Sequence, residues 1–269
     1  MSAELENRFY ELYLEFFNRA ELERRWNVQK DIPWEKSNSA VTDEIALVVE
    51  SFMAVELYLP DYTSKILELV RKSRGRAWFQ ANWGYEESKH SLALEQWLLH
   101  SGKRTHKQVN EFTEQVLAHE WNLPFQTPRQ MMIYTTFQEL STGLNYRNLR
   151  RKAIEQNDEA LSTALSHIAR DESAHYQFFQ DGVKLYLKED RDGTMEDIKF
   201  VLSTFRMPAH DLIPDWEHRG KVIVGQNIFS DRIFFKDIMR PILSVLGTSR
   251  RELQELGKTT PELTPALET

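Results

Sequence analysis

Apolar residues recur every three or four positions through most of the 269-residue chain, which is the spacing of one face of an α-helix. We expect four long helices, at about residues 41–72, 78–101, 128–156 and 159–187. Shorter helices are predicted at about residues 5–24, 107–120, 194–205 and 231–247. Pro60 should interrupt the first long helix, because proline removes a backbone donor from the helix interior. The pattern predicts an all-α fold, organised as a single domain over residues 1–269.

Two of the long helices carry a charged pair in the middle of an apolar stripe. The stretches EESKH (86–90) and DESAH (171–175) each place a glutamate three residues before a histidine. Side chains three positions apart lie on the same side of a helix, so one helix can offer a carboxylate and an imidazole to one metal ion. Either pair alone would be read as a chance occurrence, and a structural Glu–His pair beside another buried charge is the alternative. Two copies on apolar stripes favour metal ligands, namely Glu87, His90, Glu172 and His175.

Glutamates also interrupt the apolar stripes of the other two long helices. Glu56 precedes Glu87 at nearly the same spacing as Glu139 precedes Glu172, so a two-helix unit occurs twice. Either Glu56 or Glu139 alone would be read as a half-exposed residue on a helix flank. Together, one glutamate from each of two helices and Glu-x-x-His from each of the other two predict a ferritin-like four-helix bundle core with additional flanking helices. Four carboxylates and two imidazoles suit two iron ions, or manganese in place of iron, better than structural zinc.

Composition and charge exclude several other classes of function. The chain has no cysteine, which rules out disulfides, thiolate metal sites and cysteine nucleophiles. Its net charge of −7 argues against a nucleic-acid partner, and no apolar run approaches the length of a membrane span. The N-terminus lacks the features of a signal or transit peptide, so we expect a cytoplasmic protein without membrane insertion. The tail from about Thr259 is rich in Thr, Pro and Glu, and we expect it to be flexible.

Several stretches resemble the soluble acyl-[acyl-carrier-protein] desaturases, the type 2 fatty acid desaturases, which are a ferritin-like diiron family. EESKHSLALEQWLLHSGK is similar to the family's EENRHGD…YLYLSGR, and VELYLP, which contains Glu56, matches its Glu-x-x-Leu-Pro. YTTFQELST looks like YTSFQERAT, ARDESAH looks like AADEKRH, and MPAH at residues 207–210 recurs in the family. The resemblance covers roughly residues 20–215.

This resemblance implies roles for individual residues. The four glutamates and two histidines named above would bind two irons. Thr142 would be the active-site threonine, although its hydroxyl could instead bond back to a carbonyl one turn earlier. Asp171 would accept a hydrogen bond from a histidine ligand, and Trp26, in the stretch WNVQKDIP, would be the partner of Asp171.

The resemblance also implies a reaction and its partners. Family members use O2 and a diiron centre, reduced by a ferredoxin-type donor, to introduce a double bond into a saturated fatty acyl chain on acyl carrier protein. We therefore expect a homodimer with these partners. Phe52, Met53 and Met132 are candidates for the wall of an acyl channel, although ordinary core packing is the alternative for each. The basic stretches 71–76 and 147–152 are candidate docking sites for the acidic carrier, although a charge run is more often solvated helix surface.

Other functions fit the same fold. A hydroxylase or N-oxygenase with the same six ligands is the main alternative, because desaturation and oxygenation diverge after a shared oxidant. A ribonucleotide reductase small subunit should have a tyrosine about one turn after the first histidine, but position 94 is leucine. An iron-storage protein would be shorter and would form a cage, and a metal-free helical scaffold would bind no iron.

Overall fold

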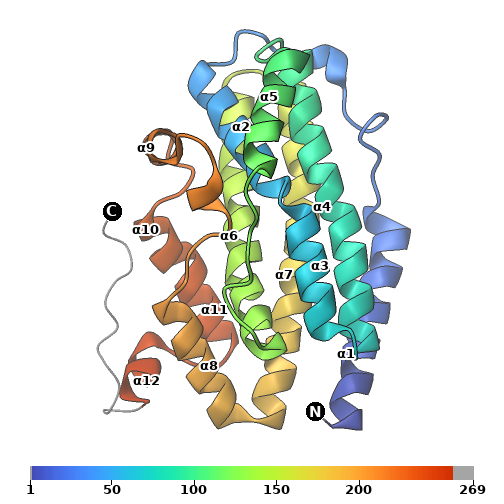
Figure 1. Cartoon of the computed structure of the whole chain (residues 1–269), viewed down its shortest axis with the longest axis vertical. Coiled ribbons are helices and arrows are strands. Elements are labelled where there is room, and N and C mark those ends of the chain that lie inside the picture. Colours follow the sequence, from blue (N-terminus) through green and yellow to red (C-terminus); the bar gives the residue numbers. More distant parts are fainter. Residues whose placement is uncertain (1, 257–269) are drawn as a thin grey trace.

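The computed structural model describes residues 2–256, which form helices and connecting loops without any strand. Its core consists of α2 (Asp43–Glu56), α3 (Leu59–Val70), α4 (Arg74–His100), α6 (Pro128–Glu155) and α7 (Glu159–Glu189). These helices lie side by side along the longest axis of the molecule (Figure 1), with α6 against α7, and α2 and α3 against α4. The predicted all-α bundle is confirmed. Within residues 2–256, no helix combines the length and the apolar character needed to cross a membrane.

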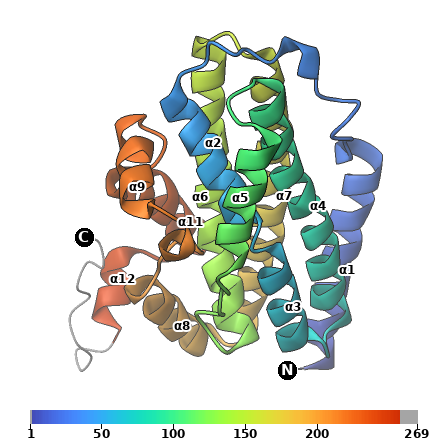
Figure 2. The same ribbon diagram turned by 45° about the horizontal axis from the view of Figure 1, so that its top comes forward.

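Additional helices flank the bundle on opposite sides, as Figures 1 and 2 both show. On one side, α1 (Ala3–Arg19) packs against α4 and α7 and ends in a π-helical turn, Ala20–Arg24. The helix α5 (His106–Leu117) follows α4. The other side is formed by α8 (Arg191–Ser203), α9 (Trp216–Gly225), α10 (Asp231–Ile233), a π-helical segment (Phe234–Met239), α11 (Arg240–Val245) and α12 (Arg250–Glu255).

The observed helices differ from the predicted ones where local chemistry is unusual. The predicted helix 41–72 is divided into α2 and α3, because Pro60 lies in the first turn of α3 and has no N–H to continue the ladder. The predicted helix 231–247 is divided into three short elements. Two helices, α9 and α12, were not predicted. The tail from Thr259, for which flexibility was expected, lies outside the described residues.

Hydrogen-bonded caps set the ends of α6 and α7. Thr127 accepts a hydrogen bond from the backbone of Gln130 at 3.2 Å, and Pro128 occupies the first turn of α6. Asp158 caps α7 by accepting from the backbone N–H of Leu161 at 2.7 Å. The same carboxylate accepts a 2.8 Å bond from the indole of Trp97 on α4. The α6–α7 turn is therefore tied to α4, which fixes the relative heights of the helices that carry the predicted ligands.

The flanking helix α9 is held to the core by a buried charge cluster. Glu50 of α2 accepts a 2.8 Å bond from Nη2 of Arg219 on α9, and a 2.5 Å bond from Nε of Arg104. Ser51 accepts a further bond from Arg219 at 3.0 Å. Because Arg219 is buried and Glu50 is its paired carboxylate, removing Glu50 would leave an uncompensated buried charge.

Candidate metal centre

The six predicted ligands meet at one place inside the bundle. Glu56 lies at the C-terminal end of α2, and Glu139 lies at the middle of α6. The two Glu-x-x-His pairs face inward from α4 and α7. All six side chains are buried, and none is more than 5% exposed. Their positions follow from the apolar stripes on which they stand, because each stripe faces the core.

The ligand atoms divide into two groups that share two carboxylates. One group contains Glu56 and His90, the other contains Glu139 and His175, and both contain Glu87 and Glu172. Within each group, one atom from each residue lies within 4.8 Å of the others. Each group therefore has its own histidine, and the two groups share two carboxylates. This arrangement is the one expected for a pair of metal ions bridged by glutamates.

Unpartnered polar atoms show that these residues fit a pair of cations. Within residues 2–256, four carboxylate oxygens and one ring nitrogen of the cluster are buried without a hydrogen-bond partner. These atoms are Glu87 Oε1, Glu139 Oε2, Glu172 Oε1 and Oε2, and His175 Nδ1. Each buried unsatisfied polar group costs about 1–3 kcal/mol, and more when it is charged. Metal ions would satisfy all five atoms at once.

Electrostatics within the cluster point the same way. Burial raises the pKa of Glu56 well above its ordinary value, and the charge of Glu87 raises it further. Burial and the charge of Glu172 likewise raise the pKa of Glu139. Burial also acts to raise the pKa of Glu87, but the positive charges of His90 and His175 outweigh it and lower this pKa to about 2. The raised pKa values of Glu56 and Glu139 therefore indicate crowded carboxyl groups that lack enough positive charge, which metal cations would supply.

Both histidines point Nδ1 into the cluster and Nε2 away from it. His90 Nδ1 lies 3.1 Å from Glu87 Oε2, and His175 Nδ1 lies 2.9 Å from Glu87 Oε1. On the outer side, His90 Nε2 is 3.4 Å from Asp171 Oδ2, and His175 Nε2 is 2.7 Å from Glu86 Oε2. A carboxylate at Nε2 holds the proton there and leaves the Nδ1 lone pair free for a metal.

The outer carboxylates are crossed between the two pairs. Asp171, next to the ligands of α7, binds the histidine of α4, and Glu86, next to the ligands of α4, binds the histidine of α7. The role of Asp171 was predicted, but that of Glu86 was not. The signal was available, because EESKH and DESAH both begin with an acid directly before the ligand glutamate.

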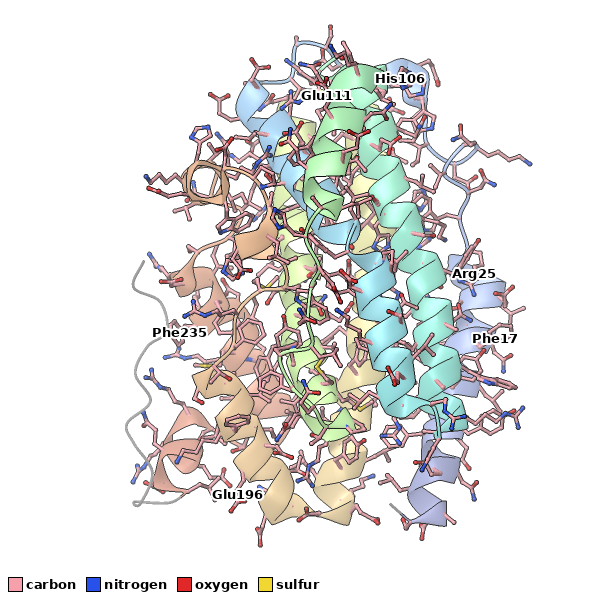
Figure 3. The ribbon with its side chains drawn as sticks, viewed as in Figure 1. Phe17, Arg25, His106, Glu111, Glu196 and Phe235 are labelled. Atoms are coloured by element: carbon pink, nitrogen blue, oxygen red, sulfur yellow. The ribbon has the colours of Figure 1, made fainter. Side chains whose placement is uncertain are left out.

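Residues 24–26, which follow α1, hold the two outer carboxylates. Trp26 donates from Nε1 to Asp171 Oδ2 at 2.7 Å, the contact expected of it. Arg24 was not predicted, yet its Nη1 donates to Glu86 Oε2 at 2.8 Å and to Asp171 Oδ1 at 2.5 Å. Arg25, labelled on the α1 side of the bundle in Figure 3, also pairs with Glu86. A single buried guanidinium thus connects the supports of both histidines.

Three further side chains lie at the inner face of α6 and α4. Tyr146 donates its hydroxyl to Glu56 Oε1 at 2.5 Å, and Trp83 donates its indole N–H to Glu139 Oε1 at 3.2 Å. Thr142 lies one turn after Glu139, and its hydroxyl donates to the carbonyl of Gln138 at 2.9 Å, so this alternative is the conformation observed.

A cavity of about 480 Å³ opens beside the cluster. Glu56 and Thr142 contribute to its wall at the metal centre. Most of the remaining wall is apolar and comes from the C-terminal helices, including Leu202, Phe234 and Phe235, the last of which is labelled in Figure 3. A cavity of this size and character is typical of a site for a small, largely apolar ligand.

Only part of the predicted channel wall lines this cavity. Phe52 does so, as expected. Met53, which is fully buried in the core, and Met132, whose sulfur packs against Gly182, do not line it, so ordinary core packing, the alternative considered for each, is what the structure has. Both methionines follow the stripe of their helix, but the cavity lies on the flank that faces the C-terminal helices.

The chain matches a family model described as fatty acid desaturase over residues 18–262. A relative named the acyl-[acyl-carrier-protein] desaturase DesA1 of Mycobacterium tuberculosis is 22% identical over 81% of this chain and 66% of its own length. The chloroplastic stearoyl-[acyl-carrier-protein] 9-desaturase 2 of Arabidopsis thaliana is 27% identical over 76% of this chain and 48% of its own length. The chain thus spans between about half and two thirds of the length of these relatives.

Solved structures share the fold. DesA2 of Mycobacterium tuberculosis H37Rv superposes with a TM-score of 0.72 at 17% identity, covering 94% of this chain and 99% of that one. An R2-like ligand-binding oxidase with a Mn/Fe cofactor superposes with a TM-score of 0.58 at 15% identity, covering 90% of this chain and 93% of that one. Because the family model extends over most of its length, this chain belongs to the fatty acid desaturase family of type 2.

Proposed function

We propose that the protein is an O2-dependent diiron desaturase. Its substrate would be a saturated fatty acyl chain on acyl carrier protein, and its electrons would come from a ferredoxin-type donor. The observation that carries this proposal is a buried cluster of four carboxylates and two imidazoles whose wall is continuous with an apolar cavity. Family membership and the names of the relatives support the choice of reaction and carrier.

The residues divide the work as follows. Glu56 and His90 would hold one iron and Glu139 and His175 the other, with Glu87 and Glu172 shared between them. When bound, the pair of irons supplies the electrons and oxidising power to take two hydrogens from unactivated methylenes with O2. The oxygen-rich ligand set also accepts manganese, so the native metal is part of the proposal.

The surrounding side chains position the ligands and the substrate. The apolar wall would hold the acyl chain and exclude water from the reacting carbons. The Thr142 hydroxyl stands where the cavity meets the cluster, and its lone pairs stay free while it donates to Gln138. It would there accept a hydrogen bond from a group at the reacting end of the cavity. Tyr146 holds Glu56 in place through its own hydroxyl.

Positive charge on the cavity wall supports an acidic carrier. Arg206 and Arg250 are exposed and both border the cavity. The two basic stretches considered from sequence, 71–76 and 147–152, do not border it, and Arg76 is buried. We therefore propose that the carrier approaches over α8 and α12. We also propose, from the family resemblance, that the enzyme acts as a homodimer.

A turnover assay with mass detection tests the function. The iron-loaded protein is supplied with reduced ferredoxin, O2 and a panel of saturated acyl carrier proteins, and the acyl chains are weighed. Loss of two hydrogens from one chain length is expected, and a Glu139→Gln variant should lose both iron and turnover. Addition of one oxygen would identify an oxygenase instead. No change on any chain, in protein that retains two irons, would refute a role in acyl chemistry.

A further inference from the structure

One asparagine in the cavity wall is buried and makes no side-chain hydrogen bond with the described part of the chain. Three polar residues of α6 line the cavity, Thr142, Asn145 and Tyr146. The first donates to Gln138 and the third to Glu56. Asn145 is 6% exposed, its carboxamide oxygen has no partner, and its side chain makes no hydrogen bond with residues 2–256.

The same helix satisfies its next asparagine fully. Asn148 lies three residues further on, is 5% exposed, and does not border the cavity. Its amide nitrogen donates to the carbonyl of Ile228 at 2.8 Å, and its oxygen accepts a 2.5 Å bond from Arg151. A buried carboxamide without such bonds loses about 1–3 kcal/mol of stability. Asn145 therefore carries an unmet demand for a partner, and the adjacent open space is the cavity.

The position of Asn145 relates this demand to the reaction. It lies one turn from Thr142, roughly 4.5 Å along the axis of α6 at the rise of an α-helix. Ile223 and Phe229 contribute apolar surface to the same cavity. A plain hydrocarbon beside Asn145 would leave the carboxamide oxygen unpaired. A hydroxyl group would donate a hydrogen bond to it.

We propose that the Asn145 carboxamide oxygen accepts a hydrogen bond from a hydroxyl group of the substrate, and thereby sets which carbons reach the metal centre. The inference rests on the proposed acyl substrate and narrows it to hydroxyacyl chains, with the hydroxyl close to the reacting carbons. A thioester carbonyl would not serve, because a carbonyl oxygen cannot donate to the carboxamide oxygen.

Two matched substitutions test this assignment, Asn145→Leu and Asn148→Leu, each in the metal-loaded protein. The probes are palmitoyl acyl carrier protein and a panel of hydroxypalmitoyl carriers. Binding is measured by calorimetry and stability by thermal unfolding. In the wild type we expect one hydroxypalmitoyl isomer to bind about 10- to 100-fold more tightly than palmitoyl acyl carrier protein.

The two variants should then behave in opposite ways. Asn145→Leu should abolish the preference for the hydroxyl and raise the unfolding midpoint, because an unpaired buried amide is removed. Asn148→Leu should keep the preference and lower the midpoint. The proposal is overturned if Asn145→Leu retains the preference, or if it destabilises the protein as Asn148→Leu does. Tight binding of all acyl probes without preference defeats this inference alone. Absence of any acyl binding defeats the proposed function as well.

Discussion

Arg24→Met removes the one side chain that joins the supports of both histidines. The guanidinium contacts Glu86 at 2.8 and 3.0 Å and Asp171 at 2.5 Å. After the substitution, Asp171 keeps Trp26 as a donor, and Glu86 keeps Arg25. Each carboxylate therefore stays hydrogen-bonded on one side, but Asp171 loses its paired guanidinium and Glu86 retains only that of Arg25.

The expected magnitude follows from burial. Both carboxylates are 1% exposed, so water cannot replace the lost partner. Removing one member of a buried ion pair costs about 3–5 kcal/mol of stability. Loss of an outer hydrogen-bond partner of a metal ligand costs about 10- to 100-fold in metal affinity. Because Arg24 supports His90 through Asp171 and His175 through Glu86, both metal positions should weaken.

Manganese titration of the metal-free protein measures the two affinities, and guanidinium unfolding measures stability. Arg25→Met is the matched control, since Arg25 is more exposed and contacts only Glu86 of the two outer carboxylates. It should weaken mainly the position that contains His175. Affinities of Arg24→Met that stay within about twofold of wild type at both positions would refute the reasoning, because orientation of the histidines would then not depend on the guanidinium.

Four further predictions follow from individual residues. Tyr146→Phe removes the hydroxyl that donates to Glu56. A two-site manganese titration should therefore show about tenfold weaker binding at the one metal position that contains Glu56. Equal weakening at both positions would contradict the assignment of Glu56 to a single position. Gly75→Ala places a Cβ 2.4 Å from the backbone carbonyl of Phe9. The free energy of unfolding in denaturant should therefore fall by about 1–3 kcal/mol. An unchanged value would show that α1 does not pack this closely against α4. The raised pKa values of Glu56 and Glu139 mean that metals displace protons, so metal affinity should rise with pH, and calorimetry in two buffers should detect proton release. Because the folded protein holds the protons of Glu56 and Glu139 more tightly than the unfolded chain does, the metal-free protein should become less stable as pH rises from the ordinary glutamate range through their raised pKa values. Denaturant unfolding at several pH values checks this dependence.

The bundle and the inward direction of the six candidate ligands were predictable because each depends on local spacing. A glutamate on an apolar stripe faces the core whatever its distant partners are. Glu56 and Glu139 were nevertheless selected only together with the two Glu-x-x-His pairs, because either alone would be read as half-exposed. Helix α9 was missed because its stretch, WEHRGKVIVG, contains two glycines and mixes polar with apolar residues. It stays folded through Arg219 and Glu50, which are 169 residues apart in the chain.

The missed site residues share this dependence on distant contacts. Arg24 reads as one of many surface cations in the stretch ELERRW, and only the docking of α1 on α4 and α7 buries it. Tyr146 reads as a core aromatic until α2 brings Glu56 within 2.5 Å of its hydroxyl. The shape of the cavity, which excludes Met53 and Met132, depends on helices that pack from the end of the chain.

The contacts that residues 24–26 make with Asp171 also determine when, during synthesis, the metal centre can assemble. The indole of Trp26 and the carboxylate it binds are separated by 145 positions in the chain. At ordinary rates of synthesis, Trp26 leaves the ribosome on the order of 10 s before Asp171 is made. Until then Arg24 and Trp26 have no carboxylate of α7 to bind, and the cluster lacks two of its six ligands. Nascent chains should therefore capture metal late, after α7 emerges, and a truncation before α7 should bind none.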